Sequence, residues 1–159
     1  MKFTSTTVKS AIGATGIAAA SIFAAATAVA APPTMGGFGT SEQLVDGPLI
    51  TNYTVSNLQP ANVTIPGYTP QGHLYQANVT AQANSGAVTP VVSDFNARAA
   101  SGQQQYRVID TVPVPNGLSP APILQGNQST GTLYFDVTGA QPNQVVYNDG
   151  TQDVLLWTA

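Results

Sequence analysis

Past residue 30, apolar side chains recur at every second position of this chain, and no long segment follows the three- and four-residue spacing of a helix. The clearest run is His73–Ala83. Its odd positions carry His73 and then only Tyr, Ala and Val, and its even positions carry Leu74 and then only Gln, Asn and Thr. Because successive side chains of a strand point to opposite faces, this run predicts a strand with one buried and one solvated face.

Two further runs repeat the alternation. Thr132–Val137 is expected to bury its odd positions and to expose Tyr134, and Val91–Arg98 is expected to bury Val91, Phe95 and Ala97. Weaker candidates complete a set of about eight short strands: Glu42–Asp46, Leu49–Val55, Gln104–Asp110, Gln144–Asn148 and Asp153–Thr158.

Turn-forming residues separate these strands. Asn148-Asp149-Gly150 predicts a tight hairpin, although the oxygen-rich stretch that follows also resembles a fragment of a calcium loop. The proline-rich stretch Pro113–Gln128 is expected to be a long surface loop or edge crossing, and Ala31–Thr40 to be loosely held. Many short strands without helices predict an all-β protein, an antiparallel β-sandwich, with a small closed barrel as the alternative.

The first thirty residues have a different composition. Lys2 and Lys9 precede the uncharged stretch Ala11–Ala26, and Ala28-Val29-Ala30 supplies the small residues of a cleavage site. This order predicts a secretory signal peptide at 1–30, with a retained membrane anchor as the alternative. Residues 31–159 would then be one secreted, extracellular domain without a stable membrane anchor, and without cysteine it would be held by packing and strand pairing alone.

Charge and residue counts exclude several classes of function. Beyond the first thirty residues only Arg98 and Arg107 oppose seven acids, which is too little positive charge for a nucleic acid or an anionic lipid surface. One histidine and no cysteine argue against a metal, and nothing suggests another cofactor. No nucleophile motif accompanies His73, which we expect to be a partly buried structural residue.

Five residues are candidates for a binding surface. Asp94, Asn96 and Arg98 are predicted to share the outward face of one strand, as a charged recognition stripe or as the solvated face of an edge strand. Tyr68 and Tyr134 are the tyrosines expected to be exposed, and tyrosine suits a contact surface because it offers a large area at low entropic cost. The other tyrosines and Trp157 are expected in or near the core.

Several runs of the chain resemble a known family. They are Ile65-Pro66-Gly67-Tyr68, Val88-Thr89-Pro90, Phe95-Asn96-Ala97-Arg98, Tyr106-Arg107-Val108, Gln128-Ser129-Thr130-Gly131, Tyr134-Phe135-Asp136-Val137-Thr138-Gly139 and Leu156-Trp157. Together they are similar to the small secreted immunogenic antigen family of mycobacteria, over essentially the whole chain after residue 30. The resemblance implies an immunoglobulin-like sandwich released outside the cell, and it carries over no catalytic residue because the family's activity is not established.

These observations leave three hypotheses. The first is a non-enzymatic binding or interaction module for a protein or glycan surface of a host or of the cell envelope. The second is a hydrolase that uses two carboxylates, as glycosidases do. The third is a conformational change triggered by acid. Mild acid would mostly charge the single histidine, so the driving force for such a change would be small.

Overall fold

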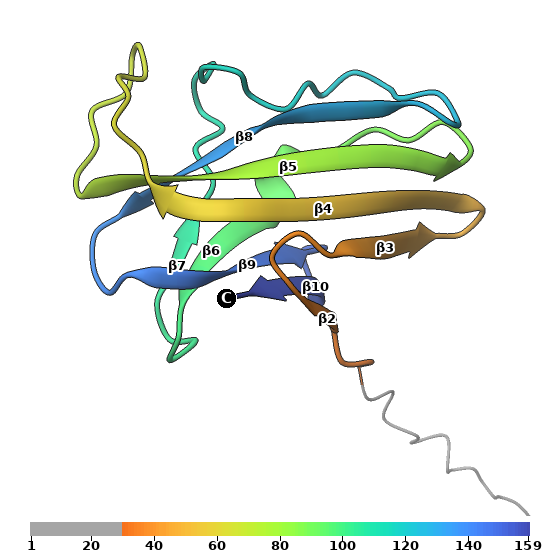
Figure 1. The fold of residues 1–159 in the computed structure, drawn as a ribbon, viewed down its shortest axis with the longest axis horizontal. Helices are drawn as coiled ribbons and strands as arrows, with labels where there is room; N and C mark the ends of the chain where they lie inside the picture. The colour runs from red at the N-terminus through yellow and green to blue at the C-terminus, as the bar shows by residue number, and fades with distance from the viewer. Residues whose placement is uncertain (1–29) are drawn as a thin grey trace, which may run out of the picture. The chain divides into compact units, whose positions relative to one another are not determined.

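Two β-sheets make up the fold, in a computed structural model that describes residues 30–159. Figure 1 labels the strands, and their bounds are β2 (Thr34–Gly37), β3 (Ser41–Asp46), β4 (Leu49–Pro60), β5 (His73–Ser85), β6 (Phe95–Ala99), β7 (Gln105–Arg107), β8 (Gln128–Val137), β9 (Pro142–Asn148) and β10 (Asp153–Thr158). A 3₁₀ turn, η2 (Val92–Asp94), lies just before β6. The predicted signal peptide lies outside the described residues except for Ala30.

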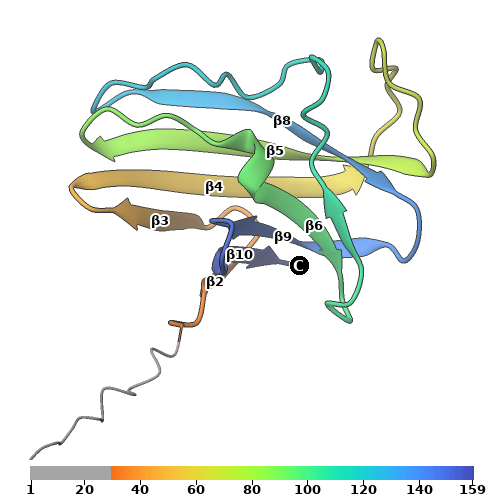
Figure 2. The ribbon, with the colours of Figure 1, turned by 180° about the vertical axis from the view of Figure 1, so that it is seen from behind.

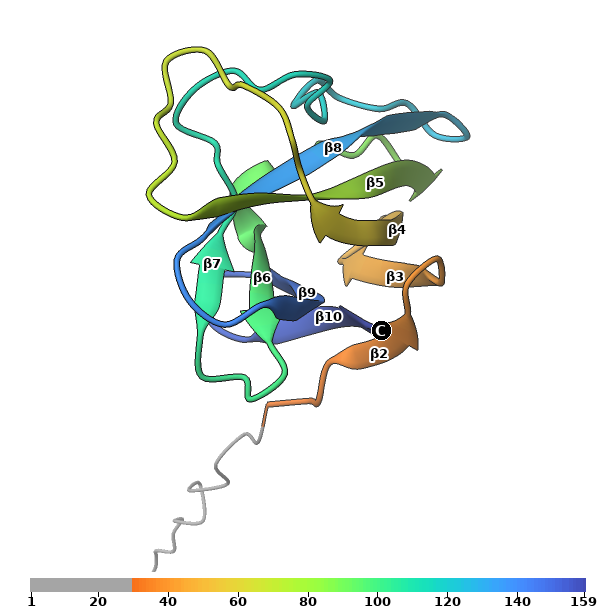
Figure 3. The same cartoon turned by 60° about the vertical axis from the view of Figure 1, so that its left-hand side comes forward.

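The sheets lie face to face as two layers (Figure 3). One has the order β3-β4-β5-β8 and the other β2-β10-β9-β6-β7. All pairs are antiparallel except β2 with β10, where Leu155–Thr158 run parallel to Thr34–Gly37. The prediction of an immunoglobulin-like β-sandwich is confirmed, because the apolar positions that alternate along the strands meet between two layers.

Aromatic rings fill the middle of the core. Phe95 packs edge-on against Tyr53 and Tyr147, with ring centroids 5.3 and 5.1 Å apart, and stacks near Trp157 at 6.4 Å. The indole N–H of Trp157 donates to the backbone oxygen of Thr40, 2.9 Å away. The predicted core positions of Tyr53, Tyr75 and Trp157 are therefore confirmed.

A second apolar cluster lies on the opposite face of the four-stranded sheet. Leu74 and Tyr134 point away from the main core and pack with Ile65 and Ile109. The long connection from β4 to β5 contributes Ile65 to this cover and is seen from behind in Figure 2. The predictions that Leu74 and Tyr134 are solvated are wrong, since segments far away in the sequence cover this face.

Four further predictions, two of them about strands, also need correction. Ala31–Thr40 is not loosely held throughout, because β2 within it pairs with β10. The predicted strand Val91–Arg98 is a strand only from Phe95, and Val91 is exposed, because η2 turns the chain before β6. The strand predicted at Gln104–Asp110 shrinks to β7, after which the chain crosses to β8. His73, expected to be partly buried, is exposed at the start of β5.

The hairpin prediction is confirmed. Asp153 pairs with Asn148, and Gly150 has φ of 98°, a left-handed value that favours glycine. The oxygen Oδ1 of Asp149 accepts from the N–H groups of Thr151 and Gln152, at 2.9 Å each. The carboxylate of Asp149 thus closes the turn itself.

Candidate functional site

A polar groove of about 320 Å³ lies on the outward side of β6 and β7. Alternation along β6 points Phe95 and Ala97 into the core and Asn96 and Arg98 outward, and β7 does the same with Tyr106 and its neighbours. The residues that line the groove are Ser93, Asp94, Phe95, Asn96, Arg98, Gln105, Arg107, Asn148 and Gly150. The structure therefore brings together Asp94, Asn96 and Arg98, three of the five predicted site residues.

Arg98 is held rigidly beside this groove. Its guanidinium donates two hydrogen bonds to Asp153, at 2.6 and 2.8 Å, and its Nε donates to the side-chain oxygens of Asn96 and Gln105. The Asn148 amide donates a further bond to Asp153, at 2.7 Å. The hydrogen bonds from Arg98 hold the pKa of the Asp153 carboxyl below its usual value, although partial burial opposes them. A forked pair of this kind fixes geometry as well as charge.

Asp94 lies beside the core. It is in η2, close to the buried hydroxyl groups of Tyr53 and Tyr147. Burial raises the pKa of Tyr53 to about 12 and raises that of Tyr147 as well, and the charge of Asp94 adds to both shifts. Asp94 and Arg98 thus share a groove but not an ion pair.

Arg107 is the cation that sequence reasoning left out of the candidate site. It is exposed, pairs in register with Asn96 across the sheet, and has no ion-pair partner within residues 30–159. A signal for it was present in the chain. Arg107 is one of two arginines after residue 30, and it alternates with a buried tyrosine.

Tyr68 lies at a different place. Its hydroxyl donates to Asp136, 2.9 Å away, and the backbone N–H groups of Gln71 and Gly72 donate to the same carboxylate, at 2.8 Å each. Burial alone would raise the pKa of Asp136, but these three hydrogen bonds together hold it below its usual value. Burial, followed by the bond to Asp136 and its charge, raises the pKa of Tyr68. Tyr68 therefore closes the β4–β5 connection.

Tyr134 is 4% exposed, so its predicted place on the surface is wrong. It belongs to the second apolar cluster together with Leu74. The aromatic half of the predicted binding surface thus separates from the charged half, and both tyrosines pack structural elements together.

Titratable side chains in and around the groove are dispersed. Asp94 is the acid in the lining of the groove, and the nearby carboxylate of Asp153 is occupied by Arg98 and Asn148. In the part of the chain that the structure describes, no three acidic or histidine side chains gather to hold a metal ion. The side chains of the groove thus offer both hydrogen-bond donors and acceptors around the guanidinium of Arg107, which has no ion-pair partner within residues 30–159.

Comparison with known proteins gives a consistent result. Residues 33–157 match the family described as "Domain of unknown function (DUF1942)". The chain is 43% identical over 159 residues, 99% of each chain, to the immunogenic proteins MPB63 of Mycobacterium bovis and MPT63 of Mycobacterium tuberculosis.

A solved structure agrees with this relationship. The crystal structure of MPT63, described as a secreted protein from Mycobacterium tuberculosis, is 42% identical with a TM-score of 0.78, and the match covers 82% of this chain and all of that one. The resemblance drawn from sequence runs, and the predicted location outside the cell, are thereby confirmed. Among residues 30–159 no helix combines the length and apolarity needed to cross a bilayer.

Proposed function

Because the chain belongs to the DUF1942 family of the mycobacterial immunogenic proteins MPB63 and MPT63, we propose that this secreted protein is a non-enzymatic binding module. It would bind a surface of the host or of the cell envelope, and the contact site would be the polar groove on β6 and β7. The observation that carries this proposal is Arg107, an exposed cation without an ion-pair partner within residues 30–159, in a groove where hydrogen bonds already hold Asn96, Arg98, Gln105 and Asn148.

Preorganisation favours binding over chemistry at this site. Arg98 is locked by Asp153, so its side chain need not be ordered when a partner arrives. Arginine is enriched among the residues that contribute most to the binding energy of interfaces. Asp153 is a poor second carboxylate for acid-base hydrolysis, because Arg98 and Asn148 already engage it.

The test is a binding assay of the secreted protein against two panels, one of cell-envelope glycans and one of host surface proteins, at micromolar concentration. Arg107→Ala is expected to weaken any captured interaction about ten-fold or more, and Arg107→Lys to restore part of the loss. Asp46→Asn, an exposed acid on β3, is the control and is expected to bind as the unchanged protein does. Absence of binding in both panels, or equal binding by Arg107→Ala, would contradict the proposal.

A further inference from the structure

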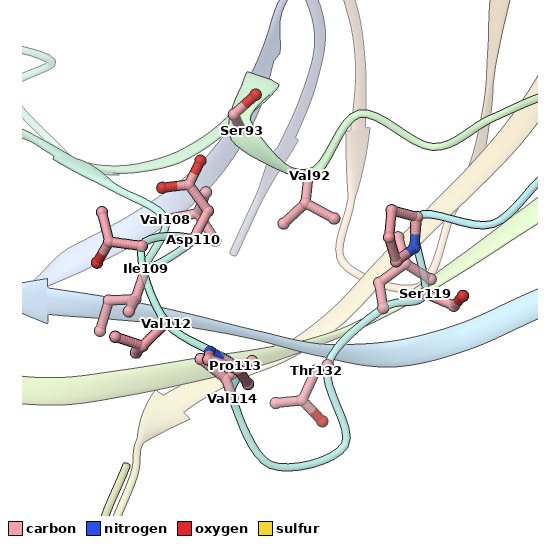
Figure 4. Close-up of a pocket in the computed structure, with 14 residues that line it drawn as sticks. Val92, Ser93, Val108, Ile109, Asp110, Val112, Pro113, Val114, Ser119 and Thr132 are labelled. Atoms are coloured by element: carbon pink, nitrogen blue, oxygen red, sulfur yellow. The ribbon is translucent and has the colours of Figure 1, made fainter. Parts of the chain in front are cut away.

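A second and larger hollow, of about 540 Å³, lies next to the polar groove. Figure 4 shows its lining: Val92, Ser93 and Asp110 surround one end, Ser119 and Thr132 the other, and valines and prolines form much of the wall. Its volume falls within the range of pockets that take small ligands. Neither the sequence patterns nor the family resemblance predicts it.

The segment that forms this hollow is pinned at two points to the free edge of β8. The N–H of Ile109 donates to the oxygen of Tyr134, and the N–H of Thr132 donates to the oxygen of Asn116, both at 2.8 Å. Between these points the chain arches away from the strand. Gly131 permits the approach, because a Cβ there would lie 2.3 Å from the backbone nitrogen of Leu118. The hollow is therefore framed by backbone contacts.

The hollow and the groove adjoin along two segments of the chain. In η2, Val92 lines the hollow, Asp94 lines the groove, and Ser93 lines both. Where β7 ends, Arg107 lines the groove and its neighbour Val108 lines the hollow. An apolar compartment and a polar one thus meet at Ser93, which is the arrangement that suits a molecule with one apolar and one polar end.

The charges indicate what kind of polar end fits. Asp94 and Asp110 line the two compartments with Arg98 and Arg107, and Arg98 is already paired with Asp153, so no excess of positive charge favours an anionic head. Asn96, Gln105 and Asn148 supply amide groups, which pair with hydroxyls as donors and acceptors. We infer that the two compartments together bind an amphiphile with an apolar chain and a neutral, hydroxyl-rich head, the chemistry of an alkyl glycoside. The chain would occupy the hollow and the head would contact Arg107.

This inference rests on the proposed function, because it names the ligand class of the same groove. It is tested by titrating the secreted protein with n-octyl β-D-glucoside below its micelle-forming concentration, followed by NMR shifts and calorimetry. Glucose, octyl sulfate and octylammonium are the matched probes. We expect octyl glucoside to bind at least about ten-fold more tightly than glucose, because the chain buries apolar area, and more tightly than either ionic probe.

Two pairs of variants separate the compartments. Ser119→Trp fills the hollow from an exposed rim position and is expected to remove the advantage of octyl glucoside over glucose, whereas Ser119→Ala should retain it. Arg107→Ala should weaken octyl glucoside and glucose alike, and Arg107→Lys less so.

Equal affinities for glucose and octyl glucoside, tighter binding of an ionic probe, or an unchanged advantage in Ser119→Trp would each overturn the composite site. If surface binding is lost in Arg107→Ala but retained in Ser119→Trp, the groove still functions as proposed and only the amphiphile inference fails. Loss of surface binding in both variants, with normal folding by circular dichroism, supports the composite site.

Discussion

Glu42 gives the most informative test of how this fold is stabilised, because replacing it by glutamine should make the protein more stable. The side chain points into the sandwich from β3, is 3% exposed, and neither carboxylate oxygen has a hydrogen-bond partner among residues 30–159. Burial raises the pKa of Glu42, and the nearby backbone N–H of Leu156 offsets only part of that effect. At neutral pH the folded state therefore carries a charge that the unfolded state solvates better.

The size of the effect follows from the cost of an unpartnered buried group. Removing the charge while keeping the shape should raise the unfolding free energy of Glu42→Gln by about 1–2 kcal/mol at pH 7, because a buried group without a partner costs more when it is charged than when it is neutral. For a domain of this length that difference corresponds to a melting temperature higher by about 3–8 °C.

The sign of the pH dependence is fixed by the direction of the shift. The folded state holds the Glu42 proton more tightly than the unfolded state, so the contribution of Glu42 to stability falls as pH rises from the ordinary value of 4.5 through the raised one. The advantage of Glu42→Gln should be small below about pH 4 and should grow as pH rises from there. Urea denaturation at several pH values measures it.

Asp46→Asn on the same strand is the control for the Glu42 prediction. Its side chain is exposed, so its unfolding free energy should change by less than about 0.5 kcal/mol at any pH. A Glu42→Gln protein that is less stable than the unchanged protein at pH 7, or an advantage that does not vary with pH, would refute the reasoning.

Two other substitutions probe the connecting segments that pack against β8 of the four-stranded sheet. Asp136→Asn removes the charged acceptor of three hydrogen bonds, and because the pKa of Asp136 is lowered, its stabilising effect should be present at neutral pH and be lost as pH falls below about 4. Hydrogen exchange at Gln71 and Gly72 should accelerate in this variant, and unchanged protection would contradict the assignment. Gly131→Ala should destabilise the protein by about 1–3 kcal/mol and shift the NMR signals of residues 116–118, because its Cβ meets backbone rather than a yielding side chain. A variant as stable as the unchanged protein would show that this segment is not pinned as described.

The core of the fold could be predicted from local pattern. Along β5 and β8 one face is continuously apolar, and the hairpin at Gly150 has a turn signal that acts within a few residues. Leu74 and Tyr134 escaped the prediction because their burial depends on Ile65 and Ile109, which lie elsewhere in the sequence. A period of two says which side chains share a face, but not whether a distant loop covers that face.

The candidate site was predictable only in part for a similar reason. Asp94, Asn96 and Arg98 were found because they are close in the sequence, whereas Asp153, the partner of Arg98, is 55 residues away. The hollow beside the groove depends on the arch between Ile109 and Asn116, which no repeating pattern encodes.

The pairing of β2 with β10 has a consequence for how the molecule is made. Residues 34–37 can find their partner only when residues 155–158 exist, so the last strand to emerge completes the sheet that the first one begins. If the chain is exported unfolded, β2 and β10 would stay unpaired until β10 has crossed the membrane. The chain would therefore remain competent for export throughout the crossing. A bulky tag placed after Ala159 would lie close to the β2–β10 pair. Removing residues of β10 would release β2 as well.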